Sequence, residues 1–241
     1  MEKDRVFAVK KKIVEPFLFD AQVTGVFDDM LNRSVPFYRE NIVRQSQLAA
    51  DFYQTGSRIY DLGCSHGNLG IQILRCFKDK PFQMIGVDAS TPMIDRYNQR
   101  LKNEPNASQV TLICKRMEEI DIENASVVLI NLTLQFLDIE RRHNLIQTVF
   151  SGMKKDGVLL LTEKTVHPEP ELNRLELDYY RRFKLENGYS ELEISQKRDA
   201  LEKVLVPDTV ETHMDRLATV GFKYRDIWLK WFNFTSMIAI K

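Results

Sequence analysis

The sequence predicts an α/β fold with a doubly wound, mostly parallel sheet of seven strands that ends in an antiparallel hairpin. In residues 57–164, short apolar runs rich in β-branched residues alternate with amphipathic segments, which is typical of a parallel sheet covered on both faces. The alternation stops over residues 165–207, where charged helical segments follow one another. Two apolar runs with a short connection then finish the chain, which predicts antiparallel neighbours.

We expect a single domain in four parts, since 241 residues with 44% hydrophobic content can bury one full core. The parts are an N-terminal helical segment (1–56), a core (57–164), a helical insertion (165–207) and a final helix with the hairpin (208–241). In the first part, "VPFYRENIVRQSQLAADFY" has apolar residues at roughly helical spacing and predicts a helix that Gly56 stops.

The sequence pattern of the core, residues 57–164, predicts five strands and three helices. The expected strands are 58–63, 82–88, 109–115, 125–133 and 157–163, and the expected helices are 68–77, 91–101 and 139–153. Ser90 is a suitable cap for the helix that begins at Thr91, because Pro92 stands where no backbone donor is needed.

The remainder predicts further helices and the hairpin. Residues 170–205 predict two or three helices. Asp208, with Glu211 three residues later, predicts a capping-box start for the last helix, which Gly221 closes. The final strands are expected at 222–229 and 232–241.

Composition excludes several classes of protein. Lys and Arg number 34, as do Asp and Glu, so no overall field draws the chain to nucleic acid or an anionic membrane, and we expect no stable binding to either. The start, "MEKDRVFAVKKK", lacks the apolar stretch of a secretory signal, and no window has the length of a membrane span, so we expect a soluble, cytoplasmic protein. The three cysteines and four histidines show no ligand spacing, which predicts no disulfide framework and no metal.

The segment "DLGCSHGNLG", residues 61–70, allows two interpretations. Residues 63–67 satisfy G-x-S-x-G, the turn that presents a nucleophilic serine in α/β hydrolases. That turn follows a later strand and needs an acid and then a histidine downstream, whereas this loop follows the first strand, and His213, the last histidine, falls on a predicted helix. We therefore favour the second interpretation, a glycine loop that opens a nucleoside site.

The surroundings of the loop support a nucleoside site. A strand precedes it, a helix follows it, and Gly63, Gly67 and Gly70 allow close approach of backbone to ligand and of helix to sheet. Asp88 ends the next strand, where an acid can accept hydrogen bonds from both ribose hydroxyls. The G-x-G-x-x-G spacing for a pyrophosphate is missing, so S-adenosylmethionine fits better than a dinucleotide.

Four strand ends agree with this placement, because ligands of such sheets bind at the carboxyl ends of the strands. They are Gly63, Asp88, Arg116 and Asn131. A purely structural interpretation, with Asp61 and Asp88 as ordinary strand-end residues, remains open at this point.

The order of elements, with "DLGCSHG" and "GVD", resembles the Rossmann-like class I S-adenosylmethionine-dependent methyltransferases. The chain is more closely similar to the carboxy-S-adenosyl-L-methionine synthase family, from "VPFYREN" through "VVLINLTLQFL" and "QKRDALEKVL" to "VETHMDRL" and "FNFTSMIAIK". The resemblance implies that S-adenosylmethionine is bound as a substrate, without a metal. The site residues it implies are Tyr38, Gly63, Cys64, Ser65, Asp88, Ala89, Arg116, Met117, Asn131 and Arg198.

The roles implied by the resemblance suit the chemistry of each residue. Residues 63–65 would wrap the amino-acid end, Asp88 and Ala89 would hold the ribose, and Met117 would pack on the adenine. Arg116 departs from the acid that many methyltransferases place near the adenine amine, so backbone contact is expected there.

Arg198 separates two enzyme interpretations. A sulfonium methyl group has no use for a guanidinium, but a carboxymethyl group offers it a carboxylate, and the family assigns Arg198 this role. By its sequence position alone, Arg198 is better explained as one of several solvated charges on an inserted helix, and the resemblance reverses that preference.

The resemblance also implies the reaction: S-adenosylmethionine and prephenate give carboxy-S-adenosylmethionine and phenylpyruvate, in a homodimer, for a downstream enzyme that modifies wobble uridine of tRNA. We expect the insertion to cover the prephenate with Tyr179, Tyr180, Arg181 and Arg182, because a dianion needs cationic donors. The alternatives are a methyltransferase acting on a small molecule or tRNA, and a non-catalytic S-adenosylmethionine-binding protein.

Overall fold

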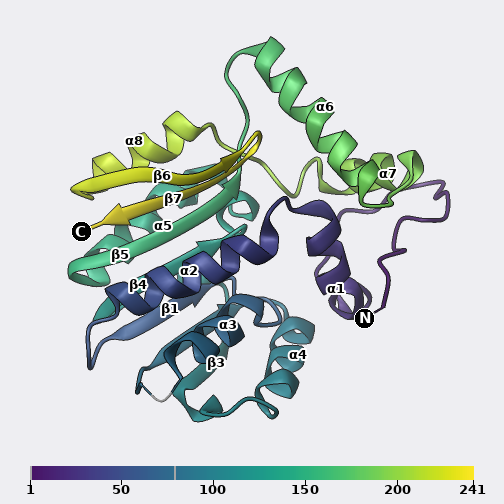
Figure 1. Ribbon diagram of the computed structural model, residues 1–241. Helices are drawn as coiled ribbons and strands as arrows, with labels where there is room; N and C mark the ends of the chain where they lie inside the picture. The colour runs from purple at the N-terminus through teal and green to yellow at the C-terminus, as the bar shows by residue number, and fades with distance from the viewer. Residues whose placement is uncertain (1, 79) are drawn as a thin grey trace.

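A seven-stranded sheet forms the centre of the molecule in a computed structural model that describes residues 2–78 and 80–241. The strands are β1 (Arg58–Leu62), β2 (Met84–Asp88), β3 (Val110–Cys114), β4 (Ala125–Asn131), β5 (Met153–Lys164), β6 (Tyr224–Trp231) and β7 (Phe234–Ile240). Their order is β3-β2-β1-β4-β5-β7-β6, with β1 to β5 parallel and β7 antiparallel to both neighbours (Figure 1). The predicted fold class is confirmed.

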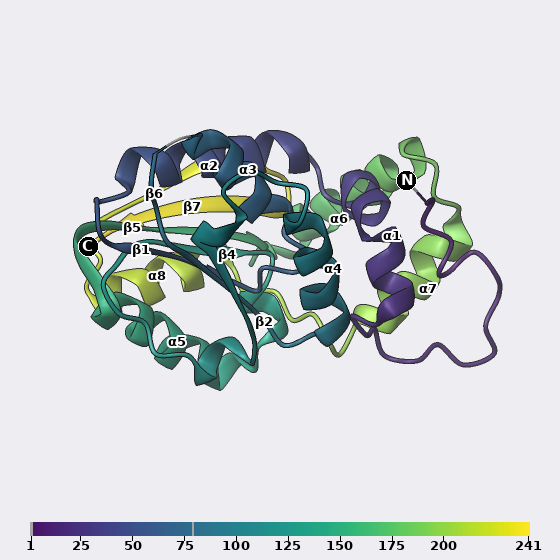
Figure 2. The same cartoon turned by 90° about the horizontal axis from the view of Figure 1, so that it is seen from below.

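Helices cover both faces of the sheet (Figure 2). One face packs on α2 (Tyr38–Phe52), α3 (Asn68–Phe77) and α4 (Thr91–Leu101), and the other on α5 (Ile139–Gly152) and α8 (Val210–Val220). Successive side chains of a strand point to opposite faces of the sheet. Ile59 therefore packs in the apolar core under α2, α3 and α4, and Tyr60 packs in the core under α5 and α8. Short 3₁₀ turns lie at Ala107–Gln109, Met117–Glu119 and Leu134–Phe136.

The N-terminal segment is helical only from residue 21 onward. Asp20 caps α1 (Ala21–Ser34), and its side chain accepts a hydrogen bond from the Val23 N–H at 2.9 Å. Residues 2–20 form no regular secondary structure, so the expectation of a helical segment over 1–56 is wrong for this stretch, and Met1 lies outside the described residues. The stretch instead runs along α7 (Glu191–Leu201), where the Phe17 N–H donates to the Ala200 carbonyl at 3.0 Å.

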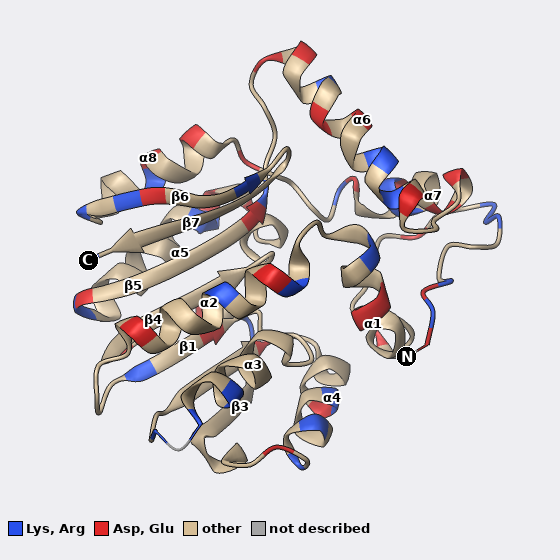
Figure 3. Ribbon diagram, viewed as in Figure 1, with Lys and Arg blue, Asp and Glu red and all other residues tan. Residues whose placement is uncertain are grey.

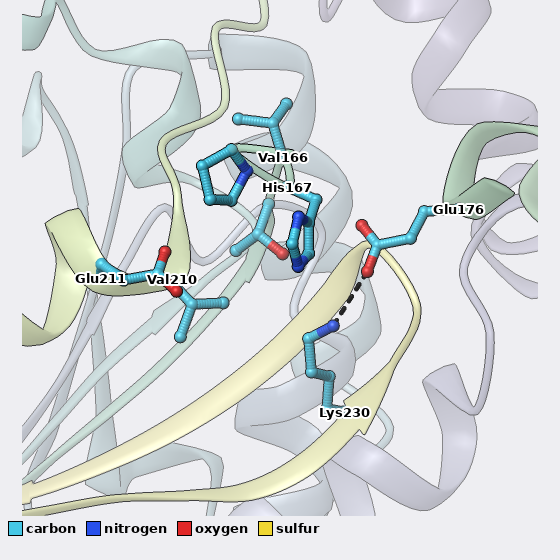
Figure 4. Close-up of a pocket in the computed structure, with 8 residues that line it drawn as sticks. Val166, His167, Glu176, Val210, Glu211 and Lys230 are labelled. Atoms are coloured by element: carbon cyan, nitrogen blue, oxygen red, sulfur yellow. Dashed lines mark hydrogen bonds and ion pairs between the residues drawn. The ribbon is translucent and has the colours of Figure 1, made fainter. Parts of the chain in front are cut away.

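The insertion consists of two helices, α6 (Pro170–Glu186) and α7, within the predicted two or three. Ser190 and Glu193 form a capping box at the start of α7. The Lys230 ammonium on β6 lies 2.9 Å from the Glu176 carboxylate on α6, beside a small pocket of about 120 Å³ that also includes His167 (Figure 4). This ion pair ties the insertion to the edge of the sheet.

The cap of the last helix, α8, lies one residue later than predicted. Thr209, not Asp208, caps α8, and its hydroxyl accepts from the Thr212 N–H at 3.1 Å. Asp208 instead lies 2.9 Å from an Arg142 nitrogen and 2.7 Å from an Arg216 nitrogen. Because Arg142 is only 1% exposed, its charge requires a counterion. The Asp208 carboxylate serves as that counterion and therefore does not cap the helix. Gly221 closes α8 in a left-handed conformation, as predicted.

Among the described residues, no helix combines the length and apolarity that a membrane span requires. Cys64, Cys76 and Cys114 are free thiols.

Candidate active site

A cavity of about 660 Å³ lies at the carboxyl ends of the parallel strands, between the sheet, α1 and the insertion. All ten residues that the resemblance implied for the site line it: Tyr38, Gly63, Cys64, Ser65, Asp88, Ala89, Arg116, Met117, Asn131 and Arg198. The volume is within the usual range for a small-molecule site. Residues from widely separated parts of the sequence therefore share one concave surface.

The glycine loop after β1 has an unusual backbone. Gly63, Ser65 and Gly67 have φ angles of 82°, 50° and 88°, so the loop alternates into the left-handed region that disfavours larger residues. A Cβ on Gly63 would lie 2.2 Å from the Thr133 side chain, and one on Gly67 would lie 2.2 Å from the Tyr97 ring. Neighbouring protein atoms leave no room for a side chain at these two positions, so the packing of the protein itself requires glycine there. The resulting loop lines the cavity.

Asp88 is held rigidly at the end of β2. One carboxylate oxygen accepts the Ser65 N–H at 2.8 Å, and the other accepts the Ser90 N–H at 2.8 Å. Each oxygen retains a free lone-pair direction for a ligand hydroxyl. Burial raises the pKa of Asp88 above its ordinary value, while both backbone hydrogen bonds oppose that rise. The carboxylate is therefore oriented before any ligand arrives.

Asp61 is a candidate that the sequence reasoning left as an ordinary strand-end residue. It lines the cavity, is 2% exposed, and its Oδ2 has no hydrogen-bond partner among the described residues. Burial, with the nearby charge of Asp88, raises the pKa of Asp61 to about 7. The available signal was its position two residues before Gly63, but only the fold shows that it lacks a partner.

Tyr38 belongs to a hydrogen-bond network that joins α1 and α2 to the glycine loop. The Asn68 amide donates to the Tyr38 hydroxyl at 3.1 Å and to the Asp28 carboxylate at 2.8 Å. His66 Nε2 lies 3.1 Å from the same carboxylate oxygen, and this contact is the main cause of the lowered pKa of Asp28. The network sets the position of Tyr38 against the loop.

The turn after β4 is positioned by a buried acid. Glu163 accepts the N–H groups of Thr133, Leu134 and Gln135 at 3.0, 2.8 and 3.1 Å. Burial raises the pKa of Glu163 to about 8, although these hydrogen bonds favour its ionised form. Asn131, at the end of β4, receives a hydrogen bond from Gln45 at 3.1 Å. No local pattern in the sequence indicated the role of Glu163.

The turn after β3 has one exposed and one buried candidate. The Arg116 side chain lies 2.6 Å from the Glu118 carboxylate, so the guanidinium already has a partner. Met117 is 9% exposed and lines the cavity, as does Glu118. This arrangement agrees with a backbone contact at Arg116 and an apolar contact at Met117.

The insertion adds basic residues to the opposite part of the cavity. Lys184, Lys197 and Arg198 line it from α6 and α7, and Lys164 does so from the end of β5. The Arg198 side chain is 74% exposed and lies 3.1 Å from the Asp199 carboxylate. Figure 3 shows Lys and Arg on the end of α6 that lies next to α7.

The expected prephenate contacts on α6 divide into two pairs. Tyr180 and Arg181 line the cavity. Tyr179 and Arg182 do not belong to its lining: the Tyr179 ring stacks on Phe232 with centroids 4.5 Å apart, and the Arg182 guanidinium lies 5.3 Å from the Tyr179 centroid. The helical period places neighbouring residues about 100° apart, so four consecutive residues cannot all face one cavity.

Comparison with known proteins identifies the family. A methyltransferase-domain family matches residues 59–157. The carboxy-S-adenosyl-L-methionine synthase of Desulforapulum autotrophicum is 55% identical over 241 residues, which is 100% of this chain and 98% of that protein. The chain belongs to the carboxy-S-adenosyl-L-methionine synthase family. The synthase of Pasteurella multocida is 42% identical, with both chains covered completely.

Solved structures share the fold at low identity. An O-methyltransferase family protein from Burkholderia thailandensis has a TM-score of 0.66 at 16% identity, and the aligned region covers 92% of this chain and 60% of that protein. Human N-acetylserotonin methyltransferase, solved with S-adenosylmethionine, has a TM-score of 0.62 at 13% identity, covering 92% and 55%. Family and fold confirm the prediction of a class I S-adenosylmethionine-dependent enzyme and overturn the serine-hydrolase alternative.

Proposed function

We propose that the protein converts S-adenosylmethionine and prephenate to carboxy-S-adenosylmethionine and phenylpyruvate. The observation that carries the proposal is the full-length identity of 55% to a protein named for the first product. The cavity supports it, because carboxylate acceptors suited to a nucleoside and an amino acid stand at β1 and β2, while cations stand at β5 and the insertion. One chamber can therefore hold a cationic and an anionic reactant together.

In this proposal the residues at β1 and β2 hold S-adenosylmethionine. Asp88 accepts from the ribose hydroxyls, and residues 63–65 contact the amino-acid end. Asp61 accepts from the α-ammonium group, because a buried carboxylate oxygen without a partner is stabilised by a cationic donor. Met117 packs on the adenine and Ala89 lies beside the ribose, while Asn131 and Tyr38 close the pocket.

The proposed reaction needs no general base from the protein. Prephenate loses carbon dioxide and hydroxide as its ring becomes aromatic, which yields phenylpyruvate. The hydroxide removes a proton from the sulfonium methyl group, which leaves water and an ylide. The ylide carbon forms a bond to carbon dioxide and gives the carboxymethyl sulfonium. The protein holds the reactants in contact and limits the access of bulk water.

Arg198 is the residue we assign to the new carboxylate. A guanidinium offers two parallel donors to a carboxylate, and Arg198 lines the cavity from α7. Its present partner, Asp199, is the neighbouring residue on an exposed surface, so that ion pair contributes little and can be exchanged for the ligand.

We further propose a homodimer in the cytoplasm, with a separate enzyme that transfers the carboxymethyl group to tRNA. On α6, Leu172, Leu175 and Tyr179 are 46%, 45% and 40% exposed at helical spacing, which suits a subunit contact. The free thiols suit a reducing compartment. Sedimentation equilibrium tests the dimer, and a single species with the mass of one chain would contradict it.

Mass spectrometry tests the reaction. Purified protein incubated with S-adenosylmethionine and prephenate should form phenylpyruvate and a nucleoside heavier than S-adenosylmethionine by one carbon dioxide. Binding of S-adenosylmethionine without any product would favour the non-catalytic alternative. Formation of S-adenosylhomocysteine with a methyl acceptor, and no carboxylated product, would favour a methyltransferase.

A further inference from the structure

The cavity has two ammonium groups that the protein leaves without a carboxylate. Arg116 is paired with Glu118, Arg181 with Glu191 and Arg198 with Asp199, and Lys197 lies 3.1 Å from the Ser34 hydroxyl and 3.9 Å from Asp4. Within residues 2–78 and 80–241, the Lys164 and Lys184 side chains form no hydrogen bond or ion pair.

These two lysines share one aromatic ring. The Lys164 and Lys184 ammonium groups lie 5.1 and 4.2 Å from the centroid of the Tyr180 ring. Tyr180 also lines the cavity, and its ring meets the Phe234 ring edge-on at a centroid distance of 5.2 Å. The π face partly stabilises the cations, but it leaves their hydrogen-bond donors available to a ligand.

Burial makes this arrangement costly in the free protein. Lys184 is only 9% exposed, and burial with the charges of Lys164, Lys197 and Arg198 lowers its pKa to about 7. Burial also lowers the pKa of Lys164. A bound anion would reverse both effects, because opposite charge favours the protonated amine.

The topology separates this group from the nucleoside residues. Lys164 is the last residue of β5, and β4 lies between β5 and β1 in the sheet. Asp61 is the next-to-last residue of β1 and Asp88 is the last residue of β2, and both strands lie on the far side of β4. An anion at the lysines and a nucleoside at the acids can therefore occupy the cavity side by side.

We infer that Lys164 and Lys184, whose ammonium groups both lie against the Tyr180 ring, form the subsite for a carboxylate of the second, dianionic reactant. This inference rests on the proposed function and specifies which residues bind prephenate. The expectation from sequence named Tyr179, Tyr180, Arg181 and Arg182; the inference keeps Tyr180 and replaces the two arginines as the cationic donors. Arg182 lies outside the cavity lining. The Arg181 side chain is 51% exposed and pairs with Glu191, whereas Lys184 is 9% exposed and has no such partner among the described residues, so the buried lysine gains more from a bound anion.

Binding measurements on single variants test the subsite. Calorimetry of prephenate binding to protein saturated with S-adenosylhomocysteine should give a Kd about tenfold higher in Lys164→Gln and in Lys184→Gln, because each loses a buried charge-assisted contact. Affinity for S-adenosylmethionine should stay within about twofold, since both groups lie away from the nucleoside residues. Lys184→Arg keeps the charge and should restore much of the loss.

The matched control is Arg174→Gln, which removes one positive charge from the exposed part of α6, where Arg174 pairs with Glu171. It should bind prephenate like the wild type. Thermal melts and circular dichroism establish that each variant is folded, and a second pair, Lys164→Met and Lys184→Met, replaces any glutamine variant that is not.

The outcomes separate the subsite from the reaction. If the wild type forms carboxy-S-adenosylmethionine but both lysine variants bind prephenate normally, the subsite is wrong and the function stands. If prephenate binds with the expected dependence on both lysines but no carboxylated product forms, the function fails and the subsite stands. Failure of the wild type to bind prephenate overturns both.

Discussion

Asp61 and Asp88 lie in the last two positions of neighbouring strands and both line the cavity, but their surroundings differ. Asp88 accepts backbone N–H groups on both oxygens, whereas Asp61 has one buried oxygen without a partner among the described residues. The same side chain is thus a rigid acceptor in one position and an unstable charge in the other. A bound cationic donor would remove that instability at Asp61.

Replacing Asp61 by Asn should change how stability depends on pH. The pKa of Asp61 is raised from its ordinary value of 3.8 to about 7 in the folded protein. Between these two pH values the folded state therefore keeps the Asp61 proton, whereas the unfolded state has released it. The stability from this site is present at low pH and is lost as pH rises through about 7. From pH 5 to pH 8, ligand-free wild type should lose about 2 to 3 kcal/mol more of unfolding free energy than Asp61→Asn.

Urea unfolding of both proteins at the two pH values checks this difference. Asp61→Asn should also bind S-adenosylmethionine at least about tenfold more weakly, because it loses a charge-assisted hydrogen bond. Glu163, whose pKa is also raised, remains in both proteins and so cancels from the comparison. Equal pH dependence in the two proteins would contradict the assignment.

Arg198→Ala should discriminate between the two sulfonium ligands. If the guanidinium binds the added carboxylate, the Kd for carboxy-S-adenosylmethionine should rise by about tenfold or more, and that for S-adenosylmethionine by less than about twofold. Calorimetry with each ligand gives the ratio directly. Since Arg198 is largely exposed, thermal stability should not change. A parallel loss for both ligands would assign Arg198 a general role in the site.

Among the contacts between helices, the packing of the Tyr97 side chain of α4 against α3 depends on Gly70. A Cβ on Gly70 would lie 1.8 Å from the Tyr97 hydroxyl and 2.8 Å from the Met84 methyl group. Tyr97 is fully buried, and its hydroxyl has no hydrogen-bond partner within the described parts of the chain. The contact is therefore steric and does not involve a polar bond.

Gly70→Ala should destabilise the fold by about 1–3 kcal/mol despite the better helix propensity of alanine, because the new methyl group overpacks the site. Tyr97→Phe alone should be nearly neutral, since the hydroxyl that it removes has no partner to lose. The double variant should recover about 1 kcal/mol, measured as the coupling energy of a double-mutant cycle in urea. Strict additivity would show that Tyr97 is not the residue displaced.

At the scale of the whole molecule, the N-terminal stretch and the insertion support each other across the open end of the cavity. The Gln196 side chain on α7 donates to the carbonyls of Phe7 at 2.8 Å and Val9 at 3.0 Å, and accepts the Lys11 N–H at 2.6 Å. A separate apolar cluster joins Phe7 and Phe17 to Ala200. The lining of the cavity thus depends on contacts between the N-terminal stretch and α7, two segments far apart in the sequence.

Gln196→Ala should loosen both partners without affecting the sheet. The variant leaves three backbone groups without their partner, at a cost of about 1–3 kcal/mol in the local opening free energy. Hydrogen exchange should speed up in residues 2–19 and in α7, while β1 and β4 keep their protection. Exchange that rises equally in the central strands would mean that the contact supports global stability.

Much of the fold followed from local patterns in the sequence. The alternation of strands and helices, the Ser90 cap and the final hairpin are confirmed, because each depends on periodicity or on residues a few positions apart. The Asp208 cap was wrong because a distant arginine competes for that carboxylate. Similarly, the sequence did not show which of residues 179–182 on α6 face the cavity, because this depends on how the helix packs.

The strand-end positions of the candidate site follow from sequence patterns, because parallel strands present their carboxyl ends at one edge in any doubly wound sheet. Which charges are paired at that edge depends on the packing of the folded chain. Asp61, Lys164 and Lys184 differ from other acids and lysines of the chain only in what surrounds them. Burial and partnership arise from contacts between residues far apart in the chain, and these carry no local signature.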